Sequence, residues 1–166
     1  MSLTPLTALS PVDGRYAARC ADLREIFSEQ GLIRARVRVE IAWLHALAGE
    51  RRITELRRIT PADLAMAQQV ADDFDEADAA TVKKFERETN HDVKAVEYLI
   101  KQKLGAHPAW QSRLEFVHFA CTSEDINNLA YALMCKEARS KVLLPHIDAL
   151  LGALRSMAHL HAEDAM

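Results

Sequence analysis

The sequence predicts an all-α fold, in which a small N-terminal helical domain is followed by the start of a long-helix bundle domain. Residues that favour tight turns are scarce, whereas Ala, Leu, Glu and Arg are abundant. The 166 residues include five Gly and five Pro, and only 6% are aromatic, a composition that favours helices over sheets. Apolar residues also recur at helical spacing along most of the chain.

The first two helices are expected before residue 50. The first covers residues 18–27. Over residues 33–47, apolar and charged residues alternate as they would in a strand, but Ile33, Val37 and Ile41 fit helical spacing equally well. The stretch is also longer than a typical strand. We therefore predict a helix there.

The next three helices are marked by the residues at their ends. The segment Thr60–Asp63 combines an N-cap hydroxyl, a proline in the first turn and an acidic capping partner. A helix over roughly residues 75–88 follows, and the Thr89–Asp92 cluster opens another. Residues 105–108 (GAHP) break the pattern before a short helix that holds Trp110.

One long helix is predicted for the end of the chain. From Glu124 to His161, apolar residues keep helical spacing over about 38 residues or about 57 Å, and a kink is expected at Pro145. A domain of this size has a radius of gyration of only about 15 Å. The apolar stripe therefore needs partners from other subunits, from further chain, or from both. We divide the chain into an N-terminal helical domain, 1–110, and the first part of a central helical-bundle domain, 111–166.

Composition and missing motifs exclude several functions. The formal net charge of −3 offers no basic excess for nucleic acid. No apolar run reaches the length that spans a bilayer, and the first residues do not form a secretory leader, so a cytoplasmic protein is expected. His159 and His161 lie two apart, on different helix faces, and do not form a zinc pair. Gly-rich dinucleotide or phosphate loops and a nucleophile elbow are missing from the sequence.

Two polar clusters are candidate anion sites. Thr89–Asp92 and Thr122–Asp125 each precede an apolar-periodic run, so each should open a helix whose first N–H groups can bind an anion. The turn Pro11–Tyr16 adds the guanidinium of Arg15. A plainer interpretation stays open, because both clusters fit the capping box, in which hydroxyl and carboxylate only satisfy backbone donors. A cap does not need His91, which favours a ligand-facing role for that imidazole.

Three segments carry a resemblance to a known family. They are Pro11–Tyr16 (PVDGRY), Glu86–Glu97 (ERETNHDVKAVE) and Phe116–Asn128 (FVHFACTSEDINN). Together and in this order they resemble the adenylosuccinate lyases of the longer bacterial type. The third segment alone would indicate only the wider fumarase/aspartase superfamily. Many adenylosuccinate lyases have Arg before the histidine of the second segment, where this chain has Asn90.

The resemblance implies a three-domain helical enzyme that forms a homotetramer, with active sites built from several subunits. The implied reactions are β-eliminations that need no metal or organic cofactor. One cleaves adenylosuccinate to AMP and fumarate, and the other releases fumarate from the succinyl-carboxamide ribonucleotide of purine biosynthesis. Such an elimination needs a base for the proton next to a carboxylate and an acid for the departing nitrogen.

The resemblance also implies which residues contact the substrate. They come from all three segments and are Arg15, Tyr16, Asn90, His91, Asp92, Thr122 and Ser123. Thr122 and Ser123 are similar to the pair that hydrogen-bonds a carboxylate of the fumaryl group, and His91 to an accessory catalytic group. His118 resembles a further ligand-facing histidine.

The family's acid histidine, in a Thr-His-Gly segment, and its base serine, in a Ser-Ser-x-x-Met-Pro loop, do not occur in these 166 residues. We therefore expect this chain to be the N-terminal portion of a lyase that is inactive alone.

Two alternatives remain at this point. The first is another lyase of the superfamily, acting on argininosuccinate, aspartate or malate. The second is a noncatalytic helical assembly module, for which the long apolar stripe is the motive and both polar clusters are caps only.

Overall fold

The computed structural model describes residues 4–165, which form helices and no strand. The predicted all-α fold is confirmed. The outermost ends of the two predicted domains, residues 1–3 and 166, lie outside the described residues. The helical elements in chain order are α1 (Ala21–Phe27), α2 (Glu29–Gly49), η1 (Thr54–Leu56), α3 (Pro61–Asp72), α4 (Glu76–Thr89), α5 (Asp92–Gly105), α6 (Pro108–Gln111), η2 (Leu114–Phe116), α7 (Ser123–Ala138), η3 (Arg139–Leu143) and α8 (Leu144–Leu160).

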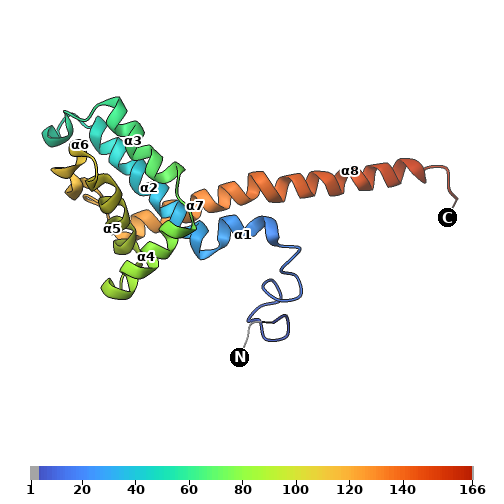
Figure 1. Cartoon of the computed structure of the whole chain (residues 1–166). Helices are drawn as coiled ribbons and strands as arrows, with labels where there is room; N and C mark the ends of the chain where they lie inside the picture. The colour runs from blue at the N-terminus through green and yellow to red at the C-terminus, as the bar shows by residue number, and fades with distance from the viewer. Residues whose placement is uncertain (1–3, 166) are drawn as a thin grey trace.

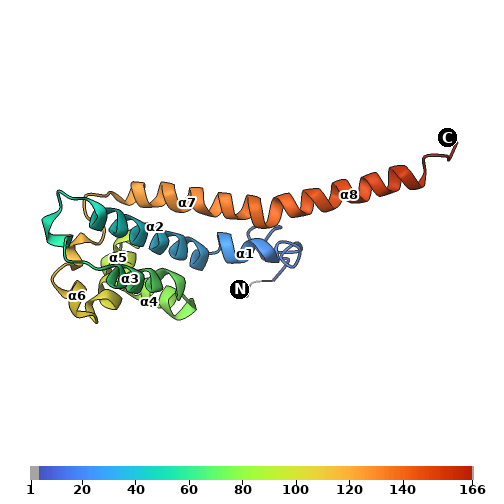
Figure 2. The same ribbon diagram turned by 90° about the horizontal axis from the view of Figure 1, so that it is seen from above.

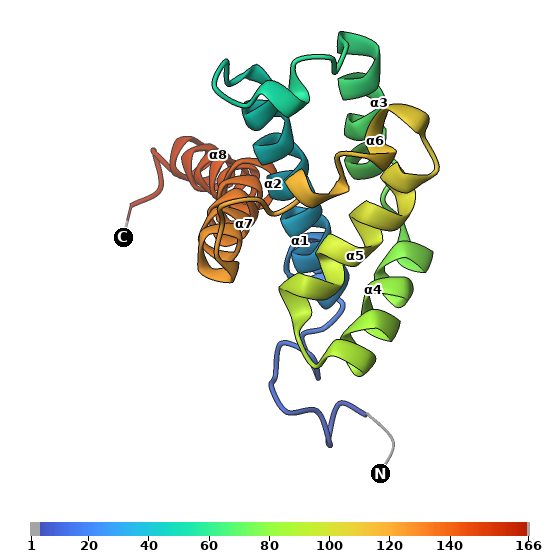
Figure 3. The same cartoon turned by 90° about the vertical axis from the view of Figure 1, so that its left-hand side faces the viewer.

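Helix α2 is the central element of the body, with α7 on one side of it and α3 to α5 on the other (Figure 3). Ile33, Val37 and Ile41 face one hydrophobic cluster, shared with α3, α4 and α5. Ala35 and Val39 face a second cluster, shared with α1 and α7. Because two sides of this helix are buried, apolar residues occur at every second position, which explains why the segment resembles a strand in the sequence. The helix predicted there is confirmed.

Several predicted helix ends are also confirmed. Helix α3 begins with a capping box between Thr60 and Asp63, and Pro61 is its first residue. The break at residues 105–108 separates α5 from the short α6, whose Trp110 is fully buried in the cluster beside α3 and α5. Helix α1 begins at Ala21, later than predicted, because residues 11–20 form successive turns instead.

The predicted long helix is confirmed as a rod made of α7, η3 and α8, which run on without a break (Figure 2). η3 is a π-helical turn just before Pro145. A proline cannot donate to the carbonyl four residues earlier, here that of Lys141, and a wider turn at this carbonyl relieves the clash with the ring. The rod therefore continues through Pro145 without a break in the helix.

The second half of the rod projects away from the body (Figure 1). None of the residues in α8 is buried. Its large apolar side chains are about half exposed, including Ile147, Leu150 and Leu154. Over the described residues, the α8 half of the predicted stripe lacks partners within the chain, as expected, whereas the α7 half has them, because Ile126 is buried against α1 and α2. None of the described helices is both long enough and apolar enough to cross a membrane.

Candidate functional site

The second sequence motif forms the tight junction between α4 and α5. Helix α4 continues through Thr89 and is ended by Asn90, whose backbone is left-handed with φ of 53°. Thr89 is thus the last residue of α4, and its hydroxyl donates to the Phe85 carbonyl at 3.0 Å. The predicted capping box between Thr89 and Asp92 is wrong, because the preceding helix extends over the residue that was expected to cap the next one.

His91 is the N-cap of α5 in place of Thr89. Its ring atom Nδ1 accepts the backbone N–H of Lys94 at 3.2 Å. The inference that a cap leaves the imidazole unused is therefore corrected: one ring nitrogen serves the cap. With Nδ1 as acceptor, the neutral ring carries its proton on Nε2, so only Nε2 is directed outward as a donor.

The third motif opens α7 in the predicted way. Thr122 and Asp125 form a capping box, in which the carboxylate accepts the backbone N–H and the hydroxyl of Thr122, both at 2.8 Å. These two bonds hold the pKa of Asp125 below its usual value. The hydroxyl of Thr122 is used within the box, whereas the hydroxyl of Ser123, the first residue of α7, points out of it.

The structure brings the second and third motifs together. Nε2 of His91 lies 3.5 Å from Oγ of Ser123, a long hydrogen bond between residues 32 positions apart. With Nε2 as donor, the Ser123 hydroxyl keeps its own proton available for an acceptor such as a carboxylate. The beginnings of α5 and α7 therefore share one polar surface, where two sets of helix N–H groups favour an anion.

A buried arginine from α2 links the same two helices. The side chain of Arg36 is only 5% exposed. Its Nη2 donates to Oδ2 of Asp92 at 2.6 Å, and its Nε donates to Oδ1 of Asn127 at 2.9 Å. Burial alone would raise the pKa of Asp92, but the Val93 amide and the Arg36 guanidinium outweigh it and lower that pKa. Asp92 is thus held as a carboxylate inside the junction.

One turn further along α2, Glu40 supports the loop that leads into α7. Its Oε1 lies 2.6 Å from Nδ1 of His118, and its Oε2 is buried without a hydrogen-bond partner. Burial raises the pKa of Glu40 against the opposing effect of His118. His118 and Ala120 both have left-handed backbones, with φ of 62° and 57°, a conformation that costs non-glycine residues energy. The contact with Glu40 and the bond from Trp43 Nε1 to the Phe119 carbonyl at 2.7 Å hold this loop.

The first motif lies apart from the other two within this chain. Arg15 and Tyr16 are exposed and stack on each other, with the guanidinium carbon 4.7 Å from the ring centroid. They sit in a turn where a Cβ on Gly14 would come 2.9 Å from the Pro5 carbonyl oxygen, so the turn requires glycine. The N-terminal segment runs beside α1, away from the junction of α4 and α5 (Figure 1).

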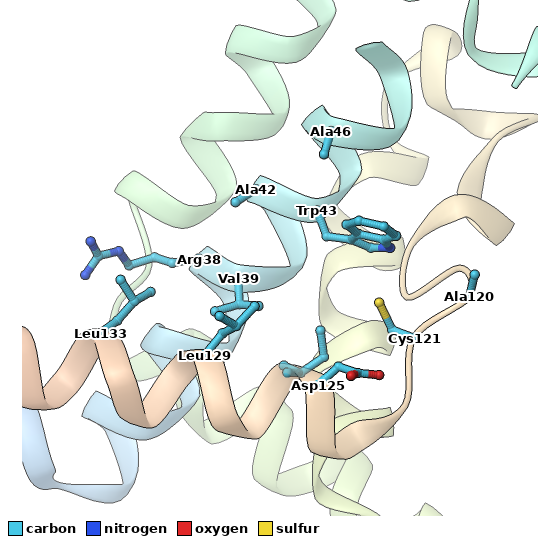
Figure 4. Close-up of a pocket in the computed structure, with 11 residues that line it drawn as sticks. Arg38, Val39, Ala42, Trp43, Ala46, Ala120, Cys121, Asp125, Leu129 and Leu133 are labelled. Atoms are coloured by element: carbon cyan, nitrogen blue, oxygen red, sulfur yellow. The ribbon is translucent and has the colours of Figure 1, made fainter. Parts of the chain in front are cut away.

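An apolar groove of about 560 Å³ runs between α2 and the first half of α7 (Figure 4). Its walls include Trp43, Cys121 and Leu129, and Asp125 lies at one end with its carboxylate held by Thr122. None of the proposed ligand-binding side chains in the described part of the chain lines this groove. Its apolar walls do not suit a doubly acidic nucleotide. The described residues also contain no group of three or more His, Cys, Asp or Glu placed to hold a metal ion.

Comparison with known proteins identifies the family. A family described as lyase matches residues 14–166. The chain belongs to this lyase family. It is 51% identical to an adenylosuccinate lyase of Vibrio cholerae and 48% identical to one of Escherichia coli K12, in each case over 95% of this chain and 35% of the relative. An adenylosuccinate lyase of Buchnera aphidicola from Schizaphis graminum is 43% identical over the whole chain and 36% of its own length. The chain thus spans about a third of the length of these relatives.

In this member of the lyase family, sequence reasoning missed the buried polar residues of α2. Arg36 and Glu40 are 4% and 1% exposed, and the alternating run in which they occur gave them no role. Their spacing of four, which places both on one helix face, was the available signal. What they contact could not be read from the sequence, because Asp92, Asn127 and His118 lie 56, 91 and 78 positions away.

Proposed function

We propose that this chain is part of an adenylosuccinate lyase, which cleaves adenylosuccinate to AMP and fumarate and releases fumarate from the succinyl-carboxamide ribonucleotide of purine biosynthesis. The names of its relatives, at 43–51% identity, support this proposal. The single observation that carries it is the contact between His91 and Ser123. This contact joins two motifs from distant parts of the chain at the beginnings of two helices, where an acidic substrate is best stabilised.

The proposed roles follow from which atoms remain available. Ser123 binds a carboxylate of the fumaryl group through its hydroxyl and the first N–H groups of α7, because the Thr122 hydroxyl is occupied by Asp125. Thr122 contributes by fixing that helix start. His91 offers Nε2 to the same carboxylate or to the reacting centre, as an accessory group that holds charge and orientation.

The nucleotide end of the substrate is assigned to Arg15, Tyr16, Asn90 and Asp92, with His118 as a further ligand-facing group. The stacked pair of Arg15 and Tyr16 presents a guanidinium suited to phosphate. Because this pair lies away from the other motifs in one chain, we propose that sites form between subunits.

The apolar stripe of α8 supports an assembly of several copies, and we propose a cytoplasmic homotetramer. Ile147, Leu150 and Leu154 leave too much apolar surface on one helix face for an isolated rod. We propose that the acid and base of the elimination come from parts of the enzyme outside these 166 residues, and that no metal or organic cofactor takes part. The complete enzyme is then required for turnover.

The test is fumarate release from adenylosuccinate by the complete enzyme. His91→Ala and Ser123→Ala should each lower kcat/KM by roughly 100-fold, the size expected when a positioned polar group is lost from the transition state. Matched controls are His107→Ala and Ser112→Ala, two exposed side chains near α6, which should leave turnover unchanged.

Two results would contradict the proposal. One is a wild-type enzyme that releases no fumarate from adenylosuccinate but acts on argininosuccinate, aspartate or malate. The other is normal turnover and affinity in both His91→Ala and Ser123→Ala, which would favour a noncatalytic module in which the polar clusters act only as caps.

A further inference from the structure

The two bonds of Arg36 end next to the two residues that meet at the proposed site. Asp92, which accepts from Nη2, directly follows His91 at the start of α5. Asn127, which accepts from Nε, lies one helical turn below Ser123 on α7. One guanidinium therefore holds both helix starts at positions adjacent to His91 and Ser123.

The guanidinium makes both bonds from a buried position. Arg36 comes from the middle of α2, where the neighbouring side chains Val37 and Val39 are packed in the two hydrophobic clusters. A rigid planar fork reaches two acceptors at fixed angles with little further loss of freedom. A lysine ammonium is a single point on a flexible stem and cannot satisfy Asp92 and Asn127 in the same geometry.

Stability alone does not require a charge at this position. An ion pair inside a protein gains roughly what its desolvation loses, so apolar residues can often fill the same space as well. The fork bonds α5 and α7 at fixed positions beside the 3.5 Å contact between Nε2 of His91 and Oγ of Ser123.

We propose that Arg36 is a positioning residue of the lyase, which aligns His91 with Ser123 through Asp92 and Asn127 and does not touch the substrate. This inference rests on the proposed function of that site. Asn127 has a matching role, because its hydrogen bond holds the Arg36 guanidinium in the orientation in which it bonds Asp92.

The test measures kcat and KM for adenylosuccinate in the complete enzyme. Arg36→Lys keeps the charge and should lower kcat/KM roughly 10- to 100-fold, as expected for a misplaced site, with most of the loss in kcat because Arg15 and Tyr16 still hold the nucleotide. Asn127→Ala should lower it about tenfold, and the double variant should be no worse than Arg36→Lys alone, since both changes break one device. Arg38→Lys, on the exposed side of the same helix, is the matched control and should stay within about twofold.

Melting curves separate positioning from folding. Should Arg36→Lys fail to fold, the half-buried Asn127 carries the test, because its truncation leaves the ion pair with Asp92 in place. A folded Asn127→Ala enzyme with wild-type kcat overturns the inference, as does a double variant whose losses multiply as for independent residues. A wild-type enzyme that does not release fumarate overturns the proposed function and the inference together, whereas active wild type with fully active Arg36→Lys overturns the inference alone.

Discussion

Helices α5 and α7 begin next to each other, but their first turns are built differently. The first turn of α7 is capped by a capping box, in which Thr122 and Asp125 satisfy each other's backbone N–H groups. The first turn of α5 is capped by the ring of His91, and its first residue, Asp92, accepts a hydrogen bond from Arg36 of α2. Ser123 takes no part in the cap of α7, and the cap of α5 uses Nδ1 of His91 but leaves Nε2. Each helix thus contributes one polar atom to the shared surface.

The largest difference between the two helix starts should appear when their carboxylates are removed. Asp92→Ala leaves the buried guanidinium of Arg36 without its partner and should cost about 2–3 kcal/mol, somewhat less than a fully buried pair because the Asp92 side chain is 45% exposed. Asp125→Ala removes only the exposed capping bonds from Thr122 and should cost less. Thermal denaturation of the complete enzyme measures the loss of stability in each variant. Equal melting temperatures for Asp92→Ala and Asp125→Ala would contradict the difference between the two helix starts.

The next difference concerns the two threonines that have the same position in their motifs. Thr122→Ala removes the N-cap of α7 and should cost about 1 kcal/mol. Thr89→Ala should cost less than about 0.5 kcal/mol, because its hydroxyl donates to the Phe85 carbonyl within α4 and accepts only a long 3.3 Å bond from the His91 N–H, with no bond to the first turn of α5. Melting temperatures of the two variants, measured side by side, decide the point. If Thr89→Ala lowered the free energy of unfolding as much as Thr122→Ala does, Thr89 would be the cap of α5, which would contradict the assignment of His91 to that role.

The smallest expected effect is a pH dependence of the α7 cap. The backbone and side-chain bonds from Thr122 hold the folded-state pKa of Asp125 below its ordinary value of about 3.9. A lowered folded pKa means that the stabilisation is fully present above the unfolded pKa and is lost as the pH falls through the folded pKa. The melting temperatures of wild type and Asp125→Asn should therefore differ by a constant amount above about pH 5, and the difference should shrink as the pH falls below the ordinary pKa and through the folded one. A difference that does not narrow at all on acidification would contradict this origin.

Features set by neighbouring residues could be predicted from the sequence, and features set by distant ones could not. The Thr60 cap, the Thr122 cap and the long rod depend on residues within a few turns, and all are confirmed. The start of α5 was misassigned because it depends on where α4 ends, and Asn90 ends it one residue after Thr89.

The candidate site shows the same limit. His91 and Ser123 could be singled out by residue type and by resemblance, but their contact depends on how α5 and α7 pack against α2. Arg36 could not be assigned at all, because a charged residue in an alternating run is expected to face water. The division into residues 1–110 and 111–166 stays a prediction.

The most direct measurement is a crystal structure of the complete enzyme with AMP and fumarate bound. We expect a fumarate carboxylate within hydrogen-bond distance of the Ser123 hydroxyl and the first amides of α7, with Nε2 of His91 directed at the same ligand. Fumarate bound elsewhere, with His91 and Ser123 separated and neither in contact with it, would contradict the claim that these two helix starts form one site.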